Sequence, residues 1–126
     1  MLRSDEMRSR PVPEPDGEVQ LRRMQGRDLD QVLVIERAFA APWTREMFHQ
    51  ELTQSEVSEN WVAEIGACVV GYVLWWYVVD EVHIVNLAVH DAFRRRGVAR
   101  RLLGALFERA RGRGMSIATL EVRTHN

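Results

Sequence analysis

The pattern of hydrophobic and polar positions divides the first half of the chain into a short strand and two helices. Weak alternation over residues 18–24 predicts an edge strand. Apolar residues then recur at helical spacing behind Asp28, which is placed to cap a helix that stops before Pro42. Thr44 caps a second, shorter helix over residues 44–52. Both helices therefore precede the main run of strands.

Three strand-like runs and a long amphipathic helix fill the second half. The runs at 61–65, 68–79 and 82–89 are separated by short turns, which predicts an antiparallel meander. Apolar side chains recur at helical spacing over residues 99–110, with arginines on the opposite face. A last strand over residues 116–123 should lie parallel to the preceding one, because a crossover helix joins them. The predicted fold is α/β (α+β), a mixed, mostly antiparallel sheet with flanking helices.

The length and composition fit one folded domain behind a leader. The chain has 126 residues, which suffice for a single core without disulfides. Prolines among charged residues predict a flexible leader over residues 1–17, so the folded domain spans residues 18–126. No apolar run reaches the roughly 18 residues of a membrane-spanning helix, and the N-terminus lacks a signal-peptide core. We expect a cytoplasmic protein with no membrane partner.

Charge is distributed unevenly along the sequence, and the cysteine and histidine residues do not form a metal-binding motif. Residues 1–89 hold 8 Arg against 15 Asp or Glu, whereas residues 90–126 hold 9 Arg against 3 acids. The basic C-terminal part is therefore a candidate anion site. Cys68 is the only cysteine, which excludes an internal disulfide, and the histidines lack the spacing of a site such as H-E-x-x-H. We expect no metal.

The arginines gather in "NLAVHDAFRRRGVARRLL", where a strand should pass through a turn into the long helix. Backbone N–H groups in the first turn of a helix have no intrahelical acceptor and carry the positive end of the helix dipole. Gly97 and the small Ala99 would let a ligand approach these groups closely. The spacing matches neither the Walker loop nor the dinucleotide pattern G-x-G-x-x-G. It predicts a pyrophosphate cradle of another kind.

The spacing Arg94-x-x-Gly97-x-Ala99 after a strand resembles the acetyl-CoA binding motif R/Q-x-x-G-x-G/A of the GNAT N-acetyltransferases. Within that superfamily, the chain is similar to the ribosomal-protein-alanine N-acetyltransferases, the RimI type. Residues 120–126 resemble their L-E-V-R-x-x-N, and "AFAAPWTREMF", residues 38–48, resembles their Pro-Trp loop. The resemblance implies a GNAT-type fold for the domain and acetyl-CoA as the cosubstrate.

The resemblance also implies roles for individual positions. Glu121 would be the general base that removes a proton from the acceptor amine, and Trp43 would lie near the entrance for the acceptor peptide. The expected coenzyme-binding residues surround the pyrophosphate, lie beside the pantetheine arm, or contact the coenzyme from the neighbouring strand. They are Leu87, Ala88, Val89, Arg95, Arg96, Gly97, Val98, Ala99, Arg100 and Asn126.

These roles imply direct transfer of an acetyl group from acetyl-CoA to the α-amine at a protein N-terminus, with a ribosomal protein as one acceptor. An α-amine is largely protonated at neutral pH, with an ordinary pKa of about 7.7 to 8.0, so a carboxylate must remove a proton before attack. A backbone N–H near Val89 would polarise the thioester carbonyl. No covalent enzyme intermediate is needed.

Several of these residues also have a purely structural interpretation. Glu121 can be a solvent-facing residue of a half-exposed strand, and Trp43 can pack the first two helices together. The arginines of the long helix can be its solvated face, although nucleic-acid binding would also use them. Trp75 and Trp76 favour a core or subunit-contact strand over a base-stacking platform, because no broad basic face accompanies them. We expect no nucleic-acid partner.

The chain departs from the family pattern at its C-terminal end. The family continues beyond L-E-V-R-x-x-N into a helix with a tyrosine and a closing hairpin, whereas this chain ends at Asn126. We therefore expect the last helix and strands to be missing, and the strand over residues 116–123 to be a sheet edge at which a second copy could pair as a homodimer. Two alternative functions stay open: acetylation of a small-molecule amine, and a non-catalytic coenzyme-binding or interaction module.

Overall fold

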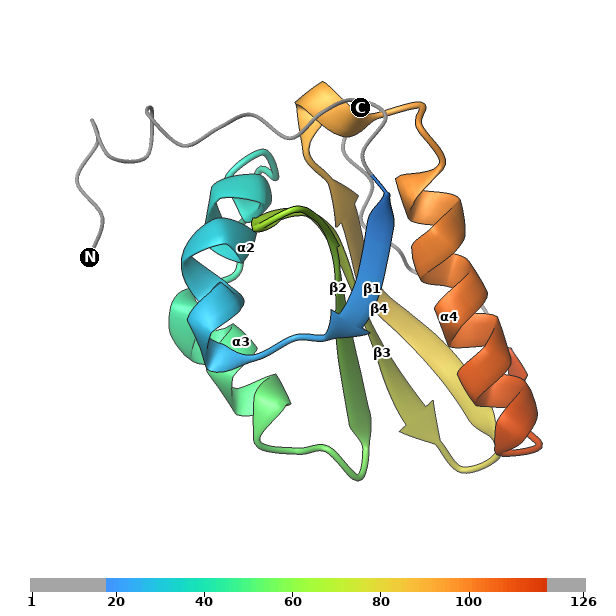
Figure 1. Cartoon of the computed structure of the whole chain (residues 1–126). Helices are drawn as coiled ribbons and strands as arrows, with labels where there is room; N and C mark the ends of the chain where they lie inside the picture. The colour runs from blue at the N-terminus through green and yellow to red at the C-terminus, as the bar shows by residue number, and fades with distance from the viewer. Residues whose placement is uncertain (1–17, 118–126) are drawn as a thin grey trace.

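The computed structural model describes residues 18–117, in which strands and helices follow one another in the predicted order (Figure 1). The strands are β1 (Val19–Arg23), β2 (Ser58–Ile65), β3 (Cys68–Val78), β4 (Glu81–Val89) and β5 (Ser116–Ile117). The helices are α2 (Leu29–Glu36), α3 (Arg45–Leu52) and α4 (Val98–Gly112), and the 3₁₀ turns η1 (Gly26–Asp28) and η2 (Asp91–Phe93) precede α2 and α4. The expected leader, residues 1–17, lies outside the described residues, as do residues 118–126.

The five strands form one sheet in the order β1-β2-β3-β4-β5. β1 to β4 pair antiparallel, and β5 pairs parallel to β4, with Glu81 opposite Ser116 and Val82 opposite Ile117. α2 and α3 cover one face of the sheet, and α4 covers the other (Figure 1). The mostly antiparallel α/β fold, the meander and the parallel crossover through α4 are therefore confirmed. The strand residues expected beyond Ile117 lie outside the described residues.

Each face of the sheet has its own hydrophobic core. Between the sheet and α4, Trp75 is fully buried and belongs to one core with Leu102 and Leu106. Between the sheet and the two N-terminal helices, the rings of Phe48 and Tyr72 meet edge to face, with centroids 5.7 Å apart. The interpretation of Trp75 as a core residue is confirmed, because a fully buried ring cannot stack on a base.

A bulge in β4 changes the face toward which its side chains point. The pairing of β4 with β3 skips Val85, which is therefore the extra residue between Ile84 and Asn86. Ile84 belongs to the core beneath α4, whereas Ala88, an even number of positions later, belongs to the core beneath α2 and α3. The bulge thus sets which side chains the last residues of β4 present to each face.

Capping agrees with the prediction at α3 and differs from it at α2. Thr44 Oγ1 accepts a hydrogen bond of 3.2 Å from the N–H of Met47, as expected of an N-cap. Asp28, by contrast, makes no side-chain capping bond to α2. Its carboxylate accepts hydrogen bonds from the Arg22 guanidinium, at 2.7 and 2.8 Å, and from the N–H of Gln25. The capping prediction for Asp28 is wrong, because a bidentate arginine and the preceding turn hold its carboxylate.

β2 begins at Ser58, before the start of the strand-like run predicted over residues 61–65. Ser58, Glu59 and Asn60 are all buried. The Ser58 hydroxyl donates to the carboxylate of Glu51 at 2.8 Å, and the Glu59 carboxylate accepts from Arg109 at 2.7 Å. Buried polar side chains are tolerated where they find such partners, so the strand starts earlier than its apolar residues predict.

Two features of the described part of the chain bear on its surroundings and its chemistry. None of the helices within residues 18–117 is long and apolar enough to cross a membrane. In the same residues, no group of three or more His, Cys, Asp or Glu side chains is arranged to hold a metal ion. The single cysteine, Cys68, is half-buried against the core beneath α4.

Candidate functional site

The turn between β4 and α4 ends in a backbone conformation that leaves the start of the helix open. Arg95 and Gly97 both have positive φ angles, 63° and 79°. Gly97 is the N-cap residue of α4, and no side chain caps the helix at that position. The N–H groups of the first turn have no acceptor within the helix, so they stay accessible to a ligand. A left-handed conformation favours glycine, which accounts for Gly97.

A pocket of about 380 Å³ opens beside this turn. Its lining comes from the end of β4, the turn and the first residues of α4: Leu87, Ala88, Val89, Phe93, Arg94, Arg95, Gly97, Val98, Ala99 and Arg100. Eight of the ten residues expected to bind the coenzyme are among them. Arg96 does not line the pocket, and its guanidinium lies over the Phe93 ring, 5.8 Å from the centroid. Asn126 lies outside the described residues.

The pocket is electropositive for two independent reasons. The first residues of α4 bring the positive end of the helix dipole to its wall. Arg95 and Arg100 add guanidinium charges, and within residues 18–117 neither forms an ion pair with an acidic side chain. Arg94, by contrast, pairs with Asp91 at 3.0 Å and so stabilises the turn. A pyrophosphate is the kind of anion that this arrangement suits.

Gly71 of β3 lets α4 lie close to the sheet at this pocket. A Cβ at this position would lie 3.0 Å from the carbonyl oxygen of Ala88 and 3.1 Å from Cγ1 of Val98. A larger residue would therefore push the first turn of α4 away from the end of β4. Sequence reasoning gave Gly71 no role in the site. An isolated glycine within a strand pattern was the signal that could have found it.

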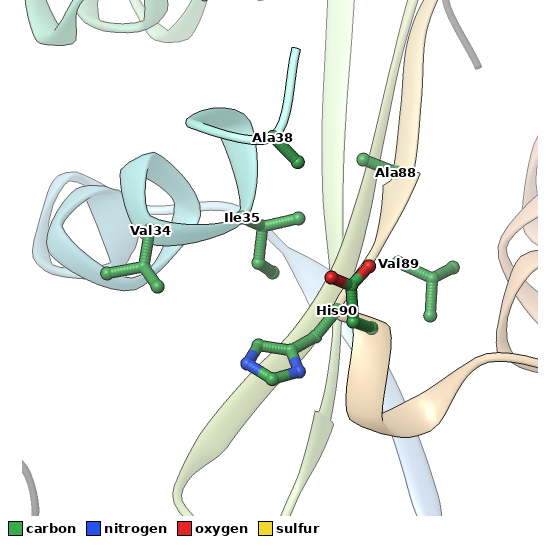
Figure 2. Close-up of a pocket in the computed structure, with 7 residues that line it drawn as sticks. Val34, Ile35, Ala38, Ala88, Val89 and His90 are labelled. Atoms are coloured by element: carbon green, nitrogen blue, oxygen red, sulfur yellow. The ribbon is translucent and has the colours of Figure 1, made fainter. Parts of the chain in front are cut away.

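A second, smaller pocket of about 80 Å³ lies on the side of β4 that faces α2 (Figure 2). Val34 and Ile35 of α2, together with Ala38, form one wall, and residues 88–91 form the other. Ala88 and Val89 also line the larger pocket. The end of β4 therefore separates a positively charged pocket from a small and mainly apolar one.

Trp43 lines neither pocket. Its half-buried ring packs against Phe48 with the centroids 5.3 Å apart, in agreement with the packing interpretation. Its backbone N–H donates a hydrogen bond of 2.7 Å to the carboxylate of Glu36. The loop that carries Trp43 is thus tied to the end of α2.

Sequence reasoning missed a polar cluster around Glu36, which is fully buried between α2 and the sheet. Its Oε1 atom accepts hydrogen bonds from the hydroxyl of Tyr72 and from the side-chain amide of Asn86, the latter at 3.1 Å. A carboxylate at helical spacing with apolar core positions was the signal that could have found the cluster. These two partners are 36 and 50 positions away in the sequence, so no local pattern identifies them.

The expected general base, Glu121, lies outside the described residues. Glu81 and His83, two ionisable residues of β4, form a pair 3.4 Å apart at the start of the strand, at the opposite end from both pockets. His90 borders the smaller pocket, and its Nδ1 atom accepts a hydrogen bond from the N–H of Ala92. That contact gives His90 a structural role as the cap of η2.

A family model and several curated proteins match this chain. The Acetyltransferase (GNAT) family matches residues 5–126. The ribosomal protein bS18-alanine N-acetyltransferase of Escherichia coli strain K12 is 31% identical over 91 residues, which cover 72% of this chain and 60% of that protein. The protein of the same name from Salmonella typhimurium strain LT2 is 33% identical over the same shares. The chain thus spans about 60% of the length of these curated relatives.

Solved structures share the architecture. The crystal structure of the ribosomal-protein-S18-alanine N-acetyltransferase from Escherichia coli superposes with a TM-score of 0.71 at 26% identity, over 83% of this chain and 66% of that one. The paia N-acetyltransferase from Thermoplasma acidophilum, solved in complex with coenzyme A, superposes with a TM-score of 0.70 over 78% of this chain and 75% of that one. At 12% identity, this second likeness shows the fold alone. The chain belongs to the acetyltransferase (GNAT) family.

Proposed function

We propose that the protein binds acetyl-CoA at the turn between β4 and α4 and transfers the acetyl group to the α-amine at a protein N-terminus. The observation that carries the proposal is the pocket at that turn, which combines an uncapped helix N-terminus, the left-handed Gly97 and arginine side chains. The name of the Escherichia coli relative supports the acceptor, and coenzyme A in the Thermoplasma acidophilum structure supports the ligand.

The coenzyme would bind mainly through the backbone of the turn. Its pyrophosphate would accept charge-assisted hydrogen bonds from the N–H groups of Val98, Ala99 and Arg100. The guanidinium of Arg95 would add an ion pair from the rim of the pocket. Arg96 would have to leave the Phe93 ring to join it, which gives up a cation–π contact worth about 0.5–1 kcal/mol at an exposed site.

The pantetheine arm would lie along the end of β4. Leu87, Ala88 and Val89 line the pocket, and their backbone groups would hydrogen-bond the amides of the arm as an added strand would. This path brings the thioester along β4 toward the bulge at Val85. A backbone N–H near Val89 would then polarise the thioester carbonyl.

The acceptor would approach from the side of α2. The smaller pocket is lined by five aliphatic side chains together with His90 and Asp91. An apolar side chain of one or two carbons suits its aliphatic part. An N-terminal alanine meets this requirement, and alanine is the residue named for the curated relatives. A ribosomal protein that begins with alanine is therefore the acceptor that we propose.

The chemistry would be a direct displacement on the thioester. Glu121 would take a proton from the ammonium group of the acceptor, directly or through water, which frees the nitrogen lone pair. The nitrogen then bonds to the thioester carbon, and the carbonyl oxygen takes the negative charge beside the backbone N–H near Val89. Collapse of this intermediate re-forms the carbonyl and breaks the carbon–sulfur bond. The thiolate of coenzyme A leaves, and the nitrogen loses one of its two protons to solvent or to sulfur, so that the amide keeps the other.

A matched set of acceptors tests the proposal. The protein is incubated with acetyl-CoA and one of three acceptors: a short peptide with a free N-terminal alanine, the same peptide with a blocked α-amine and an internal lysine, or a small polyamine. Mass spectrometry should find acetylation of the first acceptor alone. Acetylation of the polyamine alone would favour a small-molecule acetyltransferase. Coenzyme binding without any product would contradict catalysis and favour a binding module.

A further inference from the structure

Glu36 is a fully buried carboxylate at the end of an otherwise apolar helix face. α2 also buries Leu29, Val32 and Ile35, which pack in the core beneath the two N-terminal helices. A carboxylate placed in such a core loses its hydration and is tolerated only where hydrogen bonds replace the lost water. The positions of those hydrogen bonds therefore indicate what Glu36 holds in place.

Within residues 18–117, donors from three different parts of the chain meet at this carboxylate. The N–H of Trp43 donates to Oε2 at 2.7 Å from the loop between α2 and α3. The hydroxyl of Tyr72 on β3 and the side-chain amide of Asn86 on β4 donate to Oε1, the amide at 3.1 Å. Glu36 thus joins a loop to two strands of the sheet.

Two of these donors lie near the two proposed substrate sites, one beside the coenzyme pocket and one in the loop next to the smaller pocket. Asn86 directly follows the bulge residue of β4 and directly precedes Leu87, the first strand residue in the coenzyme pocket. Trp43 belongs to the loop that follows the wall of the smaller pocket, which ends at Ala38. Glu36 therefore links the strand that would carry the thioester to the loop beside the acceptor.

Glu36 is not placed to do chemistry itself. It is fully buried and lines neither pocket, so it does not reach a substrate bound in either of them. An aliphatic side chain would fill the same space without a desolvation cost, but it could not accept a hydrogen bond from Trp43, Tyr72 or Asn86. The carboxylate thus has a role that packing alone does not provide.

We propose that Glu36 is a positioning residue, whose carboxylate fixes the Trp43 loop relative to the bulge of β4 and so aligns the acceptor with the thioester. This inference rests on the proposed function for its effect on acetyl transfer. The link between loop and strand is independent of that function, because it follows from the three hydrogen bonds.

The experiment compares two buried glutamates that sit on opposite faces of the sheet. Glu36→Met removes the acceptor of the Trp43 N–H and keeps the length of the side chain. Glu59→Met is the matched control, because Glu59 is also buried, also accepts from a tyrosine hydroxyl and two other donors, and lines neither pocket. Glu36→Gln is the conservative variant, since it keeps one acceptor oxygen, and it serves if Glu36→Met does not fold.

Three quantities are measured on the full chain. Amide hydrogen exchange at Trp43 should speed up in Glu36→Met, while exchange at Met47, which Thr44 caps, stays as in the wild type. For the peptide with an N-terminal alanine, kcat/KM should fall roughly 10- to 100-fold, because misplacement by about 1 Å costs that much. The Kd for acetyl-CoA should change less than about twofold. Glu36→Gln should recover part of kcat/KM.

Each outcome decides one claim. Glu59→Met should lower the melting temperature and leave kcat/KM within about twofold when assayed well below that temperature. An equal loss of kcat/KM in both variants, or unchanged exchange at Trp43 in Glu36→Met and Glu36→Gln, would overturn the positioning role. A wild-type protein that binds acetyl-CoA and transfers nothing would overturn the proposed function instead. The exchange rate at Trp43 would then decide on its own whether Glu36 holds the loop.

Discussion

The two faces of the sheet at the end of β4 are built by different means. On the face of α4, the pocket depends on backbone groups and on the left-handed conformations of Arg95 and Gly97, all within a run of neighbouring residues. On the face of α2, the order of the loop depends on side chains at positions 36, 72 and 86 that only the fold brings together. On the α4 face, local backbone geometry sets the positions of the groups that line the pocket. On the α2 face, a buried carboxylate sets the position of the loop.

This difference suggests separate roles for the two faces: binding of the coenzyme on one, and alignment of the acceptor amine with the thioester on the other. A pyrophosphate needs several N–H groups in one direction, which a helix N-terminus supplies without any particular side chain. An acceptor amine needs a defined distance and angle to the thioester, which requires a rigid connection between loop and strand. Changes on the α4 face should therefore act on coenzyme affinity, and changes on the α2 face on acetyl transfer.

The largest expected effect is on the α4 face. In Gly97→Asp, the new carboxylate would compete for the helix N–H groups and repel the pyrophosphate, so the affinity for acetyl-CoA should fall roughly 100-fold. Asp tolerates the left-handed conformation better than most residues, so the melting temperature should change little. Isothermal titration measures the affinity. Gly26→Asp, which adds the same charge far from the pocket, should bind normally, and equal weakening in both variants would contradict the assignment.

A change beneath the pocket should act on both stability and coenzyme affinity. Gly71→Ala places a Cβ 3.0 Å from the Ala88 carbonyl and 3.1 Å from Val98 Cγ1, so α4 must shift. Overpacking of this kind should lower the free energy of unfolding by about 1–3 kcal/mol. The Kd for acetyl-CoA should rise roughly tenfold, because the helix N-terminus moves relative to β4. Urea denaturation and titration test the two effects, and lost stability with normal affinity would contradict this placement of the site.

Lowering the pH should reveal that the ionised Glu59 carboxylate stabilises the folded state. Burial by itself would raise the pKa of Glu59, but hydrogen bonds from Arg109 and Tyr77 outweigh it and hold the pKa below its ordinary value. A lowered pKa in the folded state means that the stabilisation is present above the unfolded pKa and is lost as the pH falls through the folded one. The melting temperature of the wild type should therefore fall more steeply than that of Glu59→Gln between about pH 5 and about pH 3. Parallel curves for the two proteins would show that Glu59 makes no such contribution.

The smallest expected effect is on the Kd for acetyl-CoA when single arginines near the start of α4 are replaced. Arg101 donates a hydrogen bond of 3.1 Å to the carbonyl of Val19 and does not line the pocket, so Arg101→Ala should leave the Kd for acetyl-CoA within about twofold. Arg95→Ala removes a charge at the pocket and should weaken binding about threefold to tenfold at low salt. A larger effect from Arg101 than from Arg95 would show that the coenzyme lies elsewhere on the helix.

Periodicity and local motifs predicted most of the fold and the α4 side of the site. The strand-like runs of β2 to β4, the amphipathic α4 and the Thr44 cap all follow from residues within a few positions of one another. The same holds for the turn at Gly97, whose residue types and spacing lie in one short segment. Such local patterns predict the structure well because they depend only on the backbone conformation of a few neighbouring residues.

Non-local partners account for what the sequence did not reveal. The Asp28 carboxylate accepts from Arg22 instead of capping α2. Ser58 and Glu59 belong to a strand in which Glu51 and the distant Arg109 satisfy their side chains. The bulge at Val85, which decides the faces of β4, has no signature in its own residue types. Glu36 is a polar residue in an apolar stripe, but its partners on the sheet depend on the packing of α2 against β3 and β4.

The most direct test of the central claim is to map the amide signals of the ¹⁵N-labelled protein during titration with acetyl-CoA and with acetyl-pantetheine, which lacks the pyrophosphate. If the pyrophosphate rests on the start of α4, acetyl-CoA should shift the amide signals of Gly97, Val98 and Ala99 saturably, and acetyl-pantetheine should leave them nearly unchanged. Saturable shifts confined to other parts of the chain, or equal shifts at these three amides with both ligands, would contradict the account.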